Sequence, residues 1–164
     1  MNEIVWFLLF FTPAYVANMA PPFFRKLPFG QPIDGGRKYN GKPLLGKNKT
    51  WRGLIIGTLF GGLTGYILQA CGLPFVFWWG FLLGFAALLG DAIKSFFKRQ
   101  AGFKSGASWV PFDQLDFLIV AYLVSLPLVM FSVWTVLLGF ALIFVGNVIV
   151  QVVGGATGIK TNKL

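Results

Sequence analysis

Histidine is absent from this 164-residue sequence, cysteine occurs once, at Cys71, and only five residues are acidic. Without histidine, and with a single thiol, the chain lacks the ligands of a structural zinc site and the base of a Ser-His or Cys-His triad. One cysteine also excludes a disulfide within the chain. Charged residues make up 12% of the sequence, about half the share in soluble domains, which is too little for the wet surface of a basic nucleic-acid-binding protein.

Apolar side chains are what the sequence has in abundance. Hydrophobic residues make up 56% and aromatic residues 18% of the chain, and the mean hydropathy is +0.72. The 14 Lys and Arg residues give a formal net charge of +9. This composition predicts an all-α polytopic membrane protein, and the length predicts one transmembrane catalytic domain over residues 1–164.

Charged positions divide the chain into apolar regions of membrane-spanning length. A crossing helix needs about 20 residues, so residues 4–24 make one crossing. The stretches 53–90 and 117–159 carry no charge, and each is long enough for two crossings. Turn signals at Cys71-Gly72-Leu73-Pro74 and after Pro127 mark where each stretch turns back. We therefore predict two long cytoplasmic loops and five helices, at about 3–22, 52–71, 74–98, 115–131 and 134–153.

The distribution of basic residues predicts the orientation in the membrane. Five crossings place the two ends of the chain on opposite sides, and all 14 basic residues then fall on one side. By the positive-inside rule, that side is the cytoplasm. We expect a multi-pass protein of the cell membrane whose N-terminus is outside and whose cytoplasmic parts are loops 23–51 and 92–114 and the C-terminus.

Glycines recur every four residues in the second and third predicted helices, at Gly53, Gly57, Gly61 and Gly65 and again at Gly80 and Gly84. Such a stripe lets two helix backbones approach closely. A smooth helix face could equally leave room for a lipid chain, and the sequence does not separate the two interpretations.

The first long loop ends in a basic segment that runs into the second helix. Backbone N–H groups at a helix start, beside Lys and Thr side chains, suit an anion such as phosphate. The segment is not a P-loop, because the upstream strand and the glycine spacing are missing. A basic segment that only orients the chain and touches anionic lipid is the alternative. The phosphate-binding candidates are Lys47, Lys49, Thr50, Arg52 and Gly53.

The second loop gathers carboxylates among basic residues. Asp91, Lys94, Ser95 and Lys98 are spaced to share one helix face, and Asp113 and Asp116 share a face three residues apart. Ionisable groups at membrane depth are costly and are functional candidates. Asp oxygens hold Mg²⁺, and Lys and Arg take the remaining charge of a triphosphate. The alternative is that these acids only form structural ion pairs with Lys94, Lys98 and Arg99.

These segments resemble the signature of the CTP:phosphatidate cytidylyltransferases. The matching residues are Ser95-x-x-Lys98-Arg99, Lys104, Pro111 and Asp113-x-x-Asp116, together with Lys49-Thr50-x-x-Gly53 in the first loop. The chain departs from the bacterial and eukaryotic signature at Ser105 and Gln114, and it lacks the His-Gly-Gly stretch before the paired acids. With its short length and five predicted spans, it is most similar to the archaeal CDP-archaeol synthase branch.

The resemblance implies transfer of CMP from CTP to the phosphate of unsaturated archaetidic acid (2,3-bis-O-geranylgeranylglyceryl phosphate), giving CDP-archaeol and pyrophosphate. It implies Mg²⁺ on Asp91, Asp113 and Asp116, and no nucleic acid as a partner. The oligomeric state, a homo-oligomer included, stays open. No general base is needed, because a lipid phosphate is already ionised near neutral pH. The implied catalytic residues are Asp91, Lys94, Ser95, Lys98, Arg99, Lys104, Asp113 and Asp116.

Three other functions are open to a chain of this kind. A phosphatidate cytidylyltransferase would act on ester lipids by the same chemistry. A CDP-alcohol phosphotransferase would consume the CDP-lipid, but its series of acids with an Asp-Gly and Ala-Arg pair is not present. A small cation transporter or channel could use the Asp residues as an ion site, although they cluster at the predicted cytoplasmic edge and not at mid-span.

Overall fold

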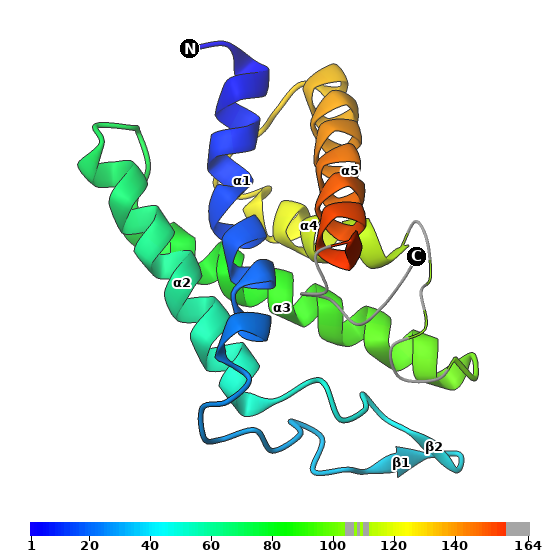
Figure 1. The fold of residues 1–164 in the computed structure, drawn as a ribbon. Coiled ribbons are helices and arrows are strands. Elements are labelled where there is room, and N and C mark those ends of the chain that lie inside the picture. The colour runs from blue at the N-terminus through cyan, green and yellow to red at the C-terminus, as the bar shows by residue number, and fades with distance from the viewer. Residues whose placement is uncertain (104–106, 108, 110–111, 157–164) are drawn as a thin grey trace.

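The computed structural model describes residues 1–103, 107, 109 and 112–156, and it is mostly helical. Five α-helices follow one another along the chain, with a short 3-10 helix and a small hairpin between the first two (Figure 1). The elements are α1 (Glu3–Met19), η1 (Pro21–Phe24), β1 (Lys38–Tyr39), β2 (Lys42–Pro43), α2 (Trp51–Ala70), α3 (Phe77–Gln100), α4 (Phe112–Ser125) and α5 (Val133–Ala156).

The predicted number and order of helices are confirmed. Most of their ends differ from the prediction by one to three residues, and the end of the fourth helix differs by six. Helix α1 ends at Met19 because Pro21 and Pro22 follow, and the chain continues as the 3-10 turn η1. Helix α4 was expected to reach residue 131, but it ends at Ser125, shortly before Pro127. Its 14 residues extend about 21 Å, which is less than the hydrocarbon thickness of a bilayer.

Four helices of the described chain are long and apolar enough to cross a membrane, namely Glu3–Phe24, Trp51–Ala70, Phe77–Gln100 and Val133–Val150. Helix α4 by itself is too short to cross a membrane. The chain after it, however, returns to the end of the molecule where α1 begins. There the Ser132 backbone N–H and hydroxyl both donate to the Glu3 carboxylate, each at 2.8 Å. Together, α4 and residues 126–132 therefore traverse the fold in the direction predicted for a fourth span.

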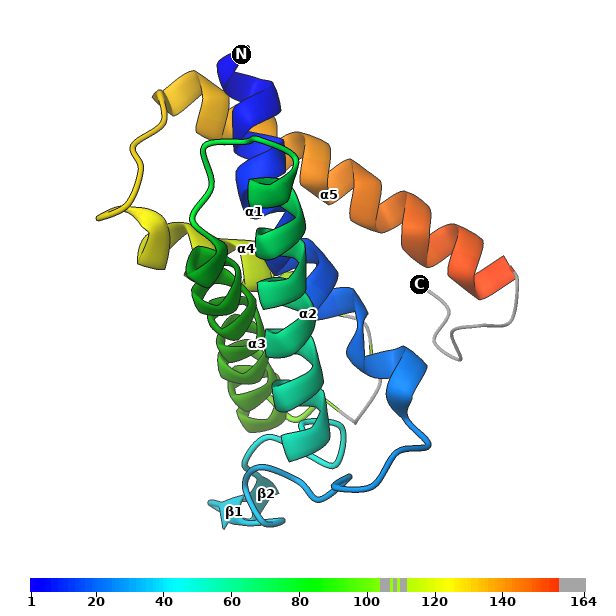
Figure 2. The same ribbon diagram turned by 90° about the vertical axis from the view of Figure 1, so that its left-hand side faces the viewer.

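Helix α1 is the centre of the bundle and packs against the other four helices (Figure 2). Its buried face is built from large aromatic rings and small alanines, and the α3 and α4 residues that meet it are mostly small or branched. The fully buried side chains include Phe7, Phe10, Phe11, Ala14, Leu83, Ala87, Phe117 and Leu118. This core fixes how α3 and α4 are placed relative to each other.

The glycine stripes of α2 and α3 face each other across an antiparallel helix pair. A Cβ at Gly61 would lie 2.6 Å from the Gly80 carbonyl oxygen, and one at Gly80 would lie 2.4 Å from the Gly61 carbonyl oxygen. No side chain fits between these backbones. The stripes therefore serve helix packing, and the space for a lipid chain that we considered is not there.

The loop between η1 and α2 has little regular structure. Strands β1 and β2 form a two-residue antiparallel pair, and the Asn40 and Gly41 backbones turn between them with positive φ. Helix α2 begins where the Thr50 hydroxyl accepts the Gly53 N–H at 3.1 Å, a standard N-cap. The loop lies under the end of α3 (Figure 1) and is joined to it through Lys42, whose ammonium donates to the Gln100 carbonyl.

Candidate functional site

Helices α3 and α4 come into backbone contact where their acidic residues lie. Gly90 of α3 has no side chain, and α4 approaches it so closely that the Asp116 carbonyl fills the place of a Cβ. The helical spacing puts Asp91 and Lys94 on neighbouring turns of α3, and Asp113 and Asp116 on the first turns of α4. The close approach brings these two polar faces together.

Lys94 lies at the centre of the three carboxylates. Its Nζ is 3.1 Å from Asp91 Oδ1, 3.0 Å from Asp113 Oδ1 and 2.9 Å from Asp116 Oδ2. The Lys94 side chain is 14% exposed and that of Asp116 only 5%, so these ion pairs are largely withdrawn from water. We call Asp91, Lys94, Asp113 and Asp116 the carboxylate cluster.

Two further lysines close the edges of the carboxylate cluster. Lys98, one turn beyond Lys94, donates to both oxygens of Asp113 at 2.9 and 2.8 Å. Lys49 comes from the loop before α2 and pairs with Asp91, 42 positions away in sequence. The ion pairs we considered from the sequence are therefore present with Lys94 and Lys98, and the third partner is Lys49 in place of Arg99.

The carboxylate cluster has the donor oxygens that Mg²⁺ prefers, with Lys94 in their midst. Among the described residues no three acidic side chains are arranged as a ready metal site. However, all three carboxylates converge on one cation, Lys94 Nζ, and Asp116 Oδ1 is buried without a hydrogen-bond partner. A buried oxygen of this kind is an unused acceptor, so the residues fit a divalent cation in chemistry.

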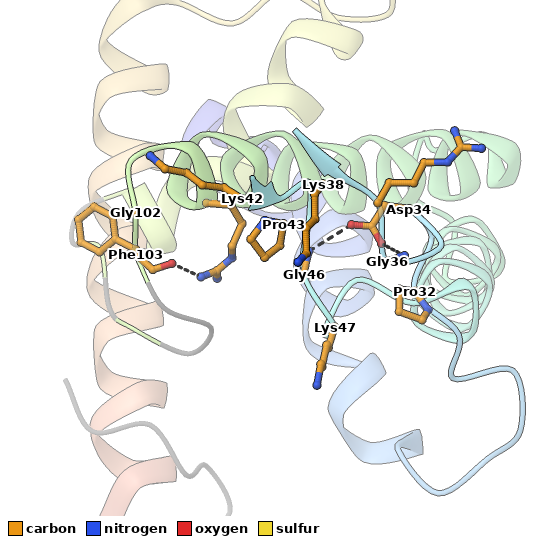
Figure 3. Close-up of a pocket in the computed structure, with 12 residues that line it drawn as sticks. Pro32, Asp34, Gly36, Lys38, Lys42, Pro43, Gly46, Lys47, Gly102 and Phe103 are labelled. Atoms are coloured by element: carbon orange, nitrogen blue, oxygen red, sulfur yellow. Dashed lines mark hydrogen bonds between the residues drawn. The ribbon is translucent and has the colours of Figure 1, made fainter. Parts of the chain in front are cut away.

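A cavity of about 490 Å³ lies between the first long loop and the end of α3, where Arg99, the residue after Lys98, lines it (Figure 3). We call it the cationic pocket, because basic side chains from both segments line it: Arg37, Lys38, Lys42, Lys47 and Arg99. Arg99 is mostly buried, and its Nη1 donates to the Phe103 carbonyl. The volume and charge of the pocket suit a polyanion of nucleotide size.

Asp34 is the acidic residue of the cationic pocket, and it was not among the site residues predicted from the sequence. Its carboxylate accepts backbone N–H groups from Gly36, Leu45 and Gly46, as Figure 3 shows in part. Burial by itself raises the pKa of a carboxyl, but these hydrogen bonds outweigh it and hold the pKa of Asp34 below its usual value. The signal in the sequence was Asp34-Gly35-Gly36, a pattern typical of an Asx turn.

The predicted phosphate-binding residues of the first loop lie in different parts of the structure and do not form one site. Lys47 lines the cationic pocket, and Lys49 reaches the carboxylate cluster. Lys49, Thr50 and Gly53 line a smaller cavity of about 50 Å³ next to Asp91. There the Gly53 N–H is already bonded to Thr50. Arg52 turns away and donates to the Leu27 carbonyl, so it stabilises the loop outside the site.

Two of the residues predicted to be catalytic are not seen acting on the site. The Ser95 hydroxyl donates to the Asp91 carbonyl of its own helix at 2.7 Å, which is a common arrangement for a helical serine. Lys104 lies outside the described residues. Helix α3 ends before it in a C-cap with positive φ at Gly102, so Lys98 and Arg99 stand in the last helical turn.

Comparison with known families gives a match over nearly the whole chain. The CarS-like family, described as CDP-archaeol synthase, matches residues 1–162. The CDP-archaeol synthase of Thermococcus gammatolerans is 41% identical over 134 residues, which are 77% of this chain and 77% of that protein. The enzyme of the same name from Methanosphaerula palustris is 44% identical over 113 residues, covering 63% and 66% of the two chains.

A solved structure has the same fold. It is described as an intramembrane enzyme for archaeal membrane lipids biosynthesis, and it superposes with a TM-score of 0.83 at 28% sequence identity. The match covers 91% of this chain and 94% of the other. The fold is therefore shared with a protein described as an intramembrane enzyme.

Proposed function

This chain belongs to the CDP-archaeol synthase family, and we propose that it transfers the cytidylyl group of CTP to the phosphate of an ether lipid, releasing pyrophosphate. The lipid is unsaturated archaetidic acid, and the product is CDP-archaeol. The structural observation that best supports this function is that neighbouring residues of α3 contribute to the carboxylate cluster and to the cationic pocket. Lys94 and Lys98 hold the carboxylate cluster, and Arg99 in the same helical turn lines the cationic pocket.

The reaction needs positioning and charge stabilisation more than proton transfer. An oxygen of the lipid phosphate attacks the α-phosphorus of CTP, and the bond from that phosphorus to the β-bridging oxygen breaks. The electron pair leaves on pyrophosphate, so no proton has to move in this step. Arg99, Lys42 and Lys47 would hold the triphosphate in the cationic pocket. Lys94 and Lys98 would stabilise the charge that develops on the leaving group.

We assign the metal to the carboxylate cluster. Asp91, Asp113 and Asp116 would hold Mg²⁺, with the partnerless Asp116 Oδ1 as one of the oxygens. When bound, Mg²⁺ neutralises phosphate charge and aligns the nucleophile with the leaving group. Lys94 carries a positive charge at the same place. It would pair with these carboxylates alongside the metal, and it would contribute to binding the phosphates alongside the other basic side chains. We include Ser95 and Lys104 in the proposed site because the family signature contains them, although the Ser95 hydroxyl donates to its own helix here.

The membrane supplies the second substrate. We place the cationic pocket on the cytoplasmic side of the cell membrane, where CTP is made, because the basic residues of both loops lie at that end of the bundle. Glu3 and Ser132 mark the opposite, outer end. The lipid would then present its phosphate at the cytoplasmic surface while its chains stay in the bilayer.

The test is a labelled assay with the purified protein in nanodiscs. Radiolabelled CTP, Mg²⁺ and diether archaetidic acid should give a CDP-lipid, and the diacyl phosphatidic acid arm measures the preference for ether over ester lipids. Absence of a CDP-lipid with both lipids would contradict the proposal. Consumption of added CDP-lipid with an alcohol acceptor would indicate a phosphotransferase, and cation flux in liposomes without nucleotide would indicate a transporter.

A further inference from the structure

The first long loop depends on a small number of contacts for its shape. Between Arg25 and Thr50 the regular structure consists of the two-residue strands β1 and β2. Ordering so many loop residues costs conformational entropy, so specific interactions must hold the loop in one conformation. Asp34 is the single acidic residue of this stretch, and it is buried, whereas residues 35–43 that follow it are exposed.

The Asp34 carboxylate joins the two ends of the loop hairpin. Its Oδ1 accepts the Gly36 N–H at 2.9 Å, next to it in sequence. Its Oδ2 accepts the Leu45 and Gly46 N–H groups at 2.8 and 3.3 Å, on the returning strand side. Hydrogen bonds to an ionised acceptor are stronger than neutral ones, and the low pKa of Asp34 keeps it ionised near neutral pH.

The hydrogen bond to Gly46 has a consequence for the cationic pocket. Gly46 has a φ of 92°, and a Cβ there would lie 3.3 Å from Arg99 Nε. The Gly46 backbone is thus seated against the Arg99 guanidinium, whose Nε is buried without a partner among the described residues. Asp34 holds the segment that determines where Arg99 can lie.

We propose that Asp34 is a positioning residue for the nucleotide: by holding the Gly46 segment against Arg99, it keeps the cationic pocket in the shape that receives the triphosphate. The inference rests on the proposed function, since it takes CTP as the occupant of the pocket. All the Asp34 contacts named above are with backbone N–H groups of its own loop. Its loss should therefore weaken nucleotide binding and leave the lipid and the chemical step little changed.

The experiment compares Asp34→Ala and the isosteric Asp34→Asn with Asn40→Gly. Asn40 lies at the exposed tip of the same hairpin with positive φ, so glycine is tolerated there and the Asp34 contacts stay intact. Calorimetric titration with CTP and steady-state kinetics would be measured in nanodiscs. We expect the Kd and KM for CTP to rise about tenfold in both Asp34 variants, with kcat and the KM for lipid within about twofold. Asn40→Gly should match the unsubstituted protein.

Three results would overturn the proposal. CTP binding within about twofold of the unsubstituted protein in both Asp34 variants would show that the pocket does not need this carboxylate. A fall in kcat with unchanged KM for CTP, or aggregation of both variants, would show a role in general stability. Failure of the proposed function is distinct from these, because it appears as no CDP-lipid from the unsubstituted protein, whatever the variants bind.

Discussion

Gly90 in α3 lies against the backbone of Asp116 in α4, so closely that a Cβ at position 90 would be 2.4 Å from the Asp116 carbonyl oxygen. This contact lets the two helices approach until Lys94 reaches carboxylates on both of them. Gly90 therefore helps to form the site because it lacks a side chain, which allows α3 and α4 to approach each other.

We predict that Gly90→Ala both destabilises the protein and lowers its activity. The added methyl group must push α4 away from α3, which typically costs about 1–3 kcal/mol of stability. The same displacement separates Asp116 from Lys94, so CDP-lipid formation should fall by at least about tenfold. Thermal unfolding and the labelled assay measure the two effects.

The matched control for this prediction is Gly146→Ala in α5. A Cβ at Gly146 meets no atom within 4 Å, so the substitution should leave both the unfolding temperature and the activity unchanged. Equal activity of Gly90→Ala and Gly146→Ala would show that the close approach of α3 and α4 is not needed for catalysis.

The acids of α4 should be essential for turnover and not for folding. Asp113→Asn and Asp116→Asn each remove one charge from the carboxylate cluster while keeping the side-chain shape. We expect kcat to fall at least about a hundredfold, because each substitution removes a carboxylate that we assign to the metal. Glu3→Gln is the control, since Glu3 is an acid at the opposite end of the bundle. Full activity in both α4 variants would place the metal elsewhere.

Local signals in the sequence account for the parts of the fold that were predicted correctly. The start of α2 follows from Thr50 as N-cap, and the α2–α3 pair follows from glycines spaced by four. The predicted end of α4 was wrong because residues 126–130 are as apolar as the helix before them. Hydropathy alone cannot distinguish an apolar helix from an apolar connecting segment, and the local indicator was Pro127.

In the candidate site, too, contacts within one helix could be predicted from the sequence, whereas contacts between distant segments could not. Asp91, Lys94 and Lys98 were placed on one face because helical spacing is a property of the sequence itself. The pairing of Lys49 with Asp91 depends on how the first loop folds onto α3, which no local pattern encodes. Asp34 was missed because a lone acid in a basic loop resembles an ordinary surface charge until its backbone partners are seen.

Lys94→Met should make the protein sensitive to magnesium. Without the ammonium, three carboxylates are left close together, and among the described residues Lys49 and Lys98 are the cations that still pair with them. Removing one partner of a buried ion pair typically costs about 3–5 kcal/mol, so the unfolding temperature should drop in EDTA. Millimolar Mg²⁺ should restore much of it, because a divalent cation replaces the lost charge.

The control for this prediction is Lys26→Met, which removes the same charge from an exposed position in the loop. Its unfolding temperature should be close to that of the unsubstituted protein and respond weakly to Mg²⁺. A Lys94→Met variant that Mg²⁺ does not stabilise beyond this control would argue against a cation site in the carboxylate cluster.

The orientation of the chain can be read with its single cysteine. Cys71 is exposed in the turn between α2 and α3, at the end of the bundle that we place outside, and the loop with Lys38 is at the other end. A membrane-impermeant thiol reagent added to intact cells should therefore label Cys71. In a Cys71→Ser background, Lys38→Cys should be labelled only after the membrane is opened, because Lys38 lines the cationic pocket, which we place on the cytoplasmic side. The reversed labelling pattern would mean that the chain has the opposite orientation in the membrane. The cationic pocket would then lie on the side where CTP is not made. The labelling therefore tests both the orientation and the assignment of CTP to this pocket.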